Sequence, residues 1–127
     1  AAAGVPLLVH ADNVDFFTTL LARQGLDAAP VTGVGDRLAL TVGGLELELY
    51  DLPTSHVAGM LMVYLPEQRL AFNSDLYSPG RERQEQLWAS ELQHGVRFRG
   101  LDVATHVGSH GRGPGTVEHL AQVAAGD

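Results

Sequence analysis

Residues 55–75 read SHVAGMLMVYLPEQRLAFNSD and contain the pattern that is most informative about the fold. The centre of this stretch, Met60–Leu65, is apolar without polar alternation, as expected of a strand that is covered on both faces. A turn at residues 66–68 leads into a second apolar run, Arg69–Phe72, so the two runs are expected to pair as neighbouring strands. The stretch therefore predicts a sheet with other layers packed on it.

A β-hairpin precedes this stretch. Arg37–Val42 and Leu45–Tyr50 alternate apolar and polar residues on either side of Gly43 and Gly44. Two glycines between alternating runs are typical of a tight hairpin turn, because both turn positions favour a positive φ. Further strands are expected at Pro6–His10 and Leu101–Val107.

Helical periodicity surrounds these strands. Asp12 and Thr116 are expected to cap the first and the last helix, and Gly95 to end the middle one. Strands that alternate with helices predict an α/β fold, with a mixed β-sheet flanked by helices. From the length of the chain, residues 1–127 are expected to form a single domain. The expected helices span residues 12–24, 80–94 and 116–125.

The charge balance excludes several kinds of partner. The 8 basic residues are all Arg and face 15 Asp and Glu, which gives a formal net charge of −7 and a pI near 5.2. Such a chain repels phosphate backbones and anionic lipid surfaces, so no nucleic acid is expected as a partner. The longest apolar run, Ala58–Leu65, is far shorter than the about 20 residues that cross a bilayer, so no membrane span is expected. With no Cys, a metal site must use His and carboxylates.

Candidate functional residues gather at predicted strand ends. His56 precedes the central strand, Asp75 follows the next strand, and His110 follows the last one beside a glycine-rich loop. Because side chains from several strand ends can converge at one edge of a sheet, we expect these three residues to share a site. Three other histidines, expected on helices or packed at the rim without a ligand role, are His94, His119 and His10.

In their order along the chain, these pieces resemble the metallo-β-lactamase-fold hydrolases. The matching motifs are Ser55-His56-x-x-Gly59, a strand and turn, Phe72-x-x-Asp75-Leu, and Ser109-His110-Gly111. The resemblance spans about half of this chain and corresponds to the C-terminal half of that fold. It implies one half of an αββα sandwich, in which two sheet-and-helix halves are pressed face to face.

The resemblance also implies a metal site. It makes His56 a ligand of one metal ion, Asp75 a bridge between two ions, and His110 a ligand of the second. The implied cofactor is zinc, two ions in the complete site, with iron or manganese as alternatives. The implied activity is metal-activated hydrolysis of a small-molecule substrate at an ester, lactone, thioester or amide-type bond. From their proximity in sequence, Tyr77 and Arg112 are expected to line the substrate mouth.

One part of the family pattern is absent. The other ligands of the family come from a His-x-His-x-Asp-His segment, and no such string occurs in the sequence. With Asp75 shared, each ion would have two protein ligands, whereas catalytic zinc generally has three. We therefore expect the chain alone to bind metal weakly and to be inactive. Half of a sandwich would also expose an apolar sheet face, which favours a homodimer.

The beginning of the chain suggests a larger protein. Residues 1–6, AAAGVP, are typical of the last turn of a helix with its glycine cap, although the body of that helix is missing. We interpret the chain as the C-terminal half of a longer protein. Removal of an initiator Met or of a signal peptide is the alternative explanation of this start.

The sequence also permits other interpretations. The chain could be a non-catalytic α/β binding or dimerisation module in which the His and Asp residues are relics of a metal site. A serine-hydrolase triad of Ser55, His56 and Asp75 is rejected, because adjacent residues in an extended segment point to opposite sides and no Gly-x-Ser-x-Gly elbow occurs. Residues 111–115 form a glycine-rich turn that could border the substrate site, but they lack the Gly-Lys-Ser/Thr ending of a phosphate loop.

Overall fold

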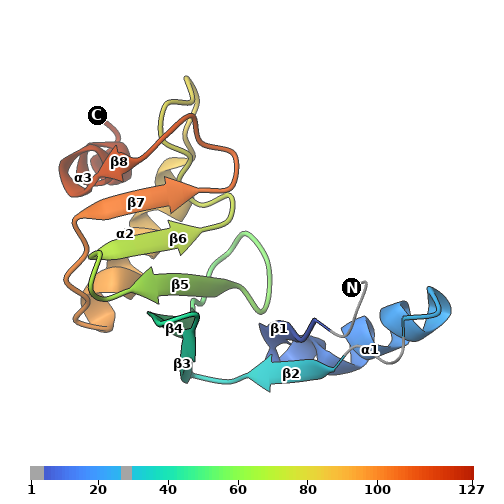
Figure 1. Ribbon diagram of the computed structural model, residues 1–127. Coiled ribbons are helices and arrows are strands. Elements are labelled where there is room, and N and C mark those ends of the chain that lie inside the picture. Colours follow the sequence, from blue (N-terminus) through green and yellow to red (C-terminus); the bar gives the residue numbers. More distant parts are fainter. Residues whose placement is uncertain (1–4, 27–29) are drawn as a thin grey trace.

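A computed structural model describes residues 5–26 and 30–127 (Figure 1). The predicted helix end at residues 1–4 lies outside the described residues. The strands are β1 Leu7–His10, β2 Val31–Val34, β3 Arg37–Val42, β4 Leu45–Asp51, β5 Leu61–Leu65, β6 Leu70–Asn73, β7 Thr105–Gly108 and β8 Gly115–Thr116. The helices are α1 Val14–Arg23, α2 Gln86–Phe98 and α3 Val117–Ala125, with a short 3-10 helix at Ala11–Asn13 before α1.

The main sheet has six strands in the order β3-β4-β5-β6-β7-β8. All neighbours are antiparallel except β6 and β7, which run parallel because α2 lies between them in the chain. Figure 1 shows α2 and α3 together behind this sheet, while β1, β2 and α1 form a small parallel unit beyond β3 and β4. The predicted fold class, a mixed sheet flanked by helices, is confirmed.

The hairpin is formed as predicted. β3 and β4 pair from Arg37 opposite Tyr50 to Val42 opposite Leu45. Gly43 and Gly44 have φ values of 59° and 83°, the two positive angles that a two-residue hairpin turn of this hand requires.

The core lies between the sheet and the two helices behind it. In β5, Met62 and Tyr64 are buried against α2 and α3, while their neighbours in the strand are only half-buried. The prediction that this strand is covered on both faces was therefore wrong for the described part of the chain. An apolar run has no polar alternation whether its second face is covered or open, so the pattern alone could not separate the two cases.

The middle helix differs most from its prediction. It begins at Gln86 instead of residue 80, because the side chain of Gln84 bonds both backbone groups of Ser78 and holds the preceding segment as a loop. It also continues through Gly95 to Phe98. Gly95 faces Leu52 so closely that a Cβ atom there would overlap the Leu52 side chain. The glycine therefore serves a close approach between α2 and the sheet, and it does not end the helix.

The first helix has Asn13 and not the expected Asp12 as its N-cap, because Asp12 lies within the 3-10 helix that precedes α1. The last helix agrees more closely with its prediction. α3 begins where the sequence predicted, and the Thr116 hydroxyl accepts a hydrogen bond from the backbone N–H of His119 as its N-cap. The last long strand starts later than expected, at Thr105, and Val103 is buried in the core before the strand begins. Within residues 5–26 and 30–127, no helix has the length and hydropathy needed to span a membrane.

Replacing Gly95 by Ala tests the approach of α2 to Leu52. Although Ala is the better helix former by about 1 kcal/mol, we expect Gly95→Ala to lower the free energy of unfolding by about 1–3 kcal/mol, because Leu52 is only 2% exposed and cannot move aside freely. Urea unfolding measures the change. Gly35→Ala, where a Cβ meets open space, is the matched control. A Gly95→Ala protein as stable as wild type would contradict this packing.

Candidate metal centre

His56 lies on the loop between β4 and β5, and α2 holds that loop in place. The carboxylate of Glu91 accepts hydrogen bonds from the Thr54 hydroxyl at 2.7 Å and from the Ser55 backbone N–H at 3.0 Å. The imidazole of His56 packs on the Trp88 ring with 4.2 Å between ring centroids. Two residues of one helix thus hold the two residues before this histidine and pack on its ring.

Asp75 follows β6 in an unusual backbone conformation. Its φ is +65°, a region that costs non-glycine residues about 1–3 kcal/mol and is found where the surrounding structure imposes it. The surroundings here are built by Asn73, which is fully buried. Its side-chain oxygen accepts from the Tyr77 N–H at 3.0 Å, and its NH₂ group donates to the Val107 carbonyl at 3.2 Å. The turn that carries Asp75 is therefore anchored to β7.

His110 is brought to the same edge by the loop after β7. The Ser109 N–H donates to the Asn73 carbonyl at 3.1 Å, and the hydroxyls of Ser109 and Ser74 lie 3.3 Å apart. Gly108 contacts the backbone of Tyr77 so closely that no side chain fits there. These contacts hold the segments that follow β6 and β7 next to each other at one edge of the sheet.

The structure brings His56, Asp75 and His110 together. His56 Nε2 lies 3.7 Å from Asp75 Oδ2, and His110 Nε2 lies 2.8 Å from Asp75 Oδ1. Each carboxylate oxygen therefore faces a different imidazole. The Ser74 hydroxyl donates to Oδ2 at 2.9 Å and orients the carboxylate. All three side chains are partly exposed, at 27%, 33% and 58%, so the group opens to solvent.

The donor chemistry fits a divalent metal, but the number of donors is small. Imidazole nitrogen and carboxylate oxygen suit zinc, iron and manganese. Among the residues that the structure describes, however, no group of three or more His, Cys, Asp and Glu side chains is arranged to hold one ion. The arrangement is therefore one shared carboxylate with a single imidazole on each side.

The two residues expected at the substrate mouth differ in outcome. Tyr77 is fully buried, and its hydroxyl contacts His119 Nδ1 at 2.5 Å, so the ring belongs to the core and its expected place at the mouth is corrected. An aromatic residue two positions after Asp75 can point either way, and here the Asn73 anchor turns it inward. Arg112 is exposed on the loop that follows His110, where its backbone N–H donates to the Pro79 carbonyl at 2.8 Å, and its place at a substrate mouth stays a prediction.

Sequence reasoning missed the residues that position this trio. Glu91 and Trp88 hold the His56 loop from α2, and Asn73 and Ser74 hold Asp75. The contacts of α2 with this loop join residues more than thirty positions apart, for example Thr54 and Glu91 with a separation of 37. No local pattern reports such contacts. Asn73 and Ser74 precede Asp75 directly, so two polar residues at the end of an apolar strand were the signal that could have identified them as positioning residues.

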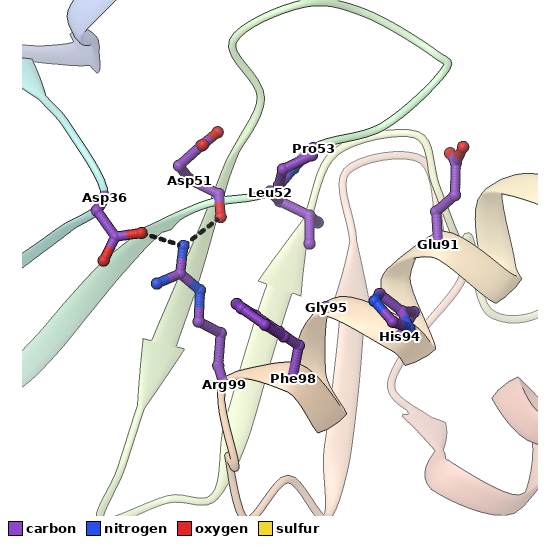
Figure 2. Close-up of a pocket in the computed structure, with 9 residues that line it drawn as sticks. All are labelled: Asp36, Asp51, Leu52, Pro53, Glu91, His94, Gly95, Phe98 and Arg99. Atoms are coloured by element: carbon purple, nitrogen blue, oxygen red, sulfur yellow. Dashed lines mark hydrogen bonds and ion pairs between the residues drawn. The ribbon is translucent and has the colours of Figure 1, made fainter.

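A cavity of about 330 Å³ lies behind the His56 loop, between β4 and α2 (Figure 2). Arg99 reaches across it, with an Nη2 atom 2.7 Å from Asp36 and 3.1 Å from the Asp51 carbonyl. The hydrogen bond from Arg99 lowers the pKa of the Asp36 carboxyl. Glu91 in the same wall binds the loop residues described above, so the polar groups named here already have partners and tie α2 to the sheet.

The remaining histidines have packing roles. His10 accepts a hydrogen bond from the Asp12 N–H and lies 3.3 Å from Asp51, as the rim residue that was expected. His94 is exposed on α2 and stacks on Phe98. His106 is 1% exposed within the core, and burial lowers the pKa of its imidazole to about 4.

Comparison with known proteins supports the fold. No protein-family model and no curated protein sequence matches the chain. A solved metallo-beta-lactamase from Pontibacter korlensis matches with a TM-score of 0.62 and 24% identity, over 96% of this chain and 57% of that one. The flavodiiron protein from Giardia intestinalis matches with a TM-score of 0.65 and 14% identity, over 94% and 34%. The chemotaxis sensor ODP from T. denticola matches with a TM-score of 0.66 and 12% identity, over 94% and 57%.

These likenesses show that the chain has the metallo-β-lactamase fold, as the motifs predicted. The chain spans only 34% to 57% of the length of the three matched chains, so it corresponds to a part of that fold. At 24% identity or less, the comparison establishes the fold, and the chemistry must be argued from the residues described above.

The buried histidine predicts a pH dependence of stability. Burial keeps the pKa of His106 near 4, below the 6.5 of an exposed imidazole, so between these values the unfolded chain binds more protons and the free energy of unfolding falls as the pH falls. We expect His106→Phe to remove up to roughly 3 kcal/mol of this fall between pH 6.5 and 4. Urea unfolding across this range measures it, with the exposed His94→Phe as control. Parallel pH profiles of wild type and His106→Phe would contradict the prediction.

Proposed function

We propose that this chain is part of a metal-dependent hydrolase, with His56, Asp75 and His110 as its share of a two-metal site. The observation that carries the proposal is the placement of the two imidazoles on opposite oxygens of one carboxylate, at 3.7 Å and 2.8 Å. A carboxylate in this position is suited to bridge two ions, each of which would take one imidazole. The metallo-β-lactamase fold of the chain supports this assignment.

The protein's own residues prepare the site for this chemistry. Asn73 and the positive φ of Asp75 fix where the carboxylate sits, and Ser74 fixes its rotation. Glu91 and Trp88 hold the His56 loop. When bound, the metal ions would lower the pKa of water to about 7 and polarise the bond under attack, which is an ester, lactone, thioester or amide-type bond in this proposal.

The donor count argues that the site is completed by residues outside this chain. Two protein ligands per ion are fewer than the three that catalytic zinc generally has. The resemblance implies that a His-x-His-x-Asp-His segment supplies the others, and the chain spans 34% to 57% of the chains it matches. The complete protein would then be active, and this chain alone inactive.

A cluster of arginines beside the site suggests the nature of the substrate. Arg112 and the loop residues Arg81 and Arg83 line a shallow cavity of about 300 Å³ together with Glu82. The Arg112 N–H to Pro79 hydrogen bond joins the two loops, which begin just after Asp75 and His110. Three cations in one concavity of a chain with a net charge of −7 favour a substrate with a carboxylate or phosphate group.

A second candidate function is a binding module without catalysis, and the open face of the sheet favours it. In the described part of the chain no helix covers the front of β5, β6 and β7 (Figure 1). This face carries Leu61 and Val63 from β5 and Phe72 from β6, which is 37% exposed. An apolar face of this kind is suited to pack against the same face of a second copy, as a homodimer.

Metal titration tests the proposed hydrolase. We expect the purified chain to bind Zn²⁺ weakly, and Asp75→Asn to bind it at least about tenfold more weakly, because the shared ligand loses its charge. Asp15→Asn, an exposed carboxylate of α1, is the matched control and should leave the affinity unchanged. Isothermal titration calorimetry measures both affinities.

A longer chain separates the two candidate functions. Adding an N-terminal segment with the His-x-His-x-Asp-His motif should raise the bound zinc, measured by elemental analysis, toward two ions per chain. Equal and negligible metal with and without that segment would contradict the hydrolase and favour the binding module.

Anion titration tests the arginine cluster independently of metal. In metal-free buffer, inorganic phosphate should shift the backbone NMR signals of Arg112 and its neighbours. The Arg81→Gln, Arg83→Gln and Arg112→Gln triple variant should bind it at least about tenfold more weakly, because charge-assisted hydrogen bonds are lost. Arg23→Gln, an exposed residue of α1, serves as the control. Equal phosphate affinity in the triple variant and wild type would contradict the assignment.

A further inference from the structure

A second cavity lies between α2, α3 and the sheet, apart from the candidate metal centre. Its volume is about 300 Å³, at the lower end of the range of about 300–1,000 Å³ for small-molecule pockets. None of the three candidate ligands lines it. Its walls are mainly apolar and come from both helices and from the segment that enters β7; they include Val96, Leu101, Val103, Leu120 and Ala121.

The polar residue of this wall that lies deepest is His106. It sits on β7 with its side chain turned toward the helices and is 1% exposed. Its partners across the sheet, Ala71 and Gly115, offer no polar side chain. Tyr77 lies edge-on to it with 6.0 Å between ring centroids, but the Tyr77 hydroxyl contacts His119 instead. Within residues 5–26 and 30–127, His106 Nδ1 has no hydrogen-bond partner.

A buried nitrogen without a partner needs an explanation. Nine in ten or more buried polar groups in folded proteins have a hydrogen-bond partner. A buried group without a partner is unfavourable, because it loses its hydrogen bonds to water and gains none in the protein. A neutral imidazole has one donor and one acceptor nitrogen, so it can bond either kind of polar group. His106 is one of the residues that line the cavity, so a molecule that fills the cavity lies next to the residue whose nitrogen lacks a partner.

The surroundings restrict the charge of such a molecule. The apolar walls disfavour an ion, because burying a charge without a paired group is costly. The charged residues of the lining, Arg97 and Glu118, have opposite signs, so they favour neither a cation nor an anion. A neutral molecule with one polar group is the best match to one imidazole in an apolar wall.

We propose that this cavity is a binding site for a small uncharged amphipathic molecule, with an apolar body between α2 and α3 and one hydroxyl or similar group bonded to His106. The site does not depend on the proposed hydrolase activity, because it shares no residue with the candidate metal centre. It adds a ligand site on the helical side of the sheet, away from the substrate mouth.

Two probes that differ in one group test this site. p-Cresol and p-xylene differ only by a hydroxyl in place of a methyl group. We expect both to shift NMR signals of cavity residues in α2 and α3, and p-cresol to shift the imidazole ¹⁵N signal of His106 as well. In His106→Phe, which keeps an aromatic ring but has no polar atom, the affinity ratio of p-cresol to p-xylene should fall by about two- to tenfold, the net contribution of one hydrogen bond.

Two variants control the test. His94→Phe makes the same chemical change on the exposed side of α2 and should keep the wild-type ratio. Ala121→Leu fills the cavity while retaining His106, so it should weaken the binding of both probes. This variant keeps the test informative if His106→Phe folds poorly. Binding outside the cavity, a His106 ¹⁵N signal unmoved by saturating p-cresol, or an unchanged ratio in His106→Phe would each overturn the proposal.

Discussion

The buried amide of Asn73 is the contact on which the candidate site depends. It ends β6, accepts from the Tyr77 N–H, donates to the Val107 carbonyl of β7, and its own carbonyl accepts from the Ser109 N–H. One residue therefore sets the backbone of the turn that carries Asp75 and of the loop before His110. A buried amide with its hydrogen bonds made is costly to rearrange, because each broken bond leaves a desolvated polar group. This explains how Asp75 is held at a positive φ with its carboxylate next to His110.

The third residue of the site is positioned by a different part of the fold. His56 depends on α2, which binds its loop through Glu91 and packs Trp88 on its ring. α2 in turn lies close to the sheet because Gly95 allows Leu52 to approach, and Arg99 ties the end of the helix to Asp36 and Asp51. The site thus joins two structural units, the β6–β7 pair and the α2–β4 contact. Movement of α2 against the sheet would change the distance between His56 and Asp75.

The two faces of the sheet differ in what covers them. The helical side contains the core, the buried Tyr77 and the cavity at His106. The other side carries Leu61, Val63 and Phe72, and no helix covers it in the part of the chain that the structure describes. Both proposed functions make use of this difference: a hydrolase needs a further layer that brings the missing ligands, and a binding module needs a partner of similar shape and polarity. In the structure, the segments that carry His56, Asp75 and His110 are accessible to solvent at one edge of the sheet.

The hairpin at Gly43 and Gly44, the fold class, and the convergence of His56, Asp75 and His110 were predictable from the sequence, because turn chemistry, hydrophobic periodicity and the order of the motifs along the chain can be read from the residues alone. Only the tertiary structure decided that Gly95 lies inside a helix, that Tyr77 points into the core, and that Glu91, Trp88 and Asn73 position the trio. Those features arise from contacts between segments far apart in sequence. Their physical cause is the close packing of α2 against the sheet and the pairing of β6 with β7, which no short stretch of residues encodes alone.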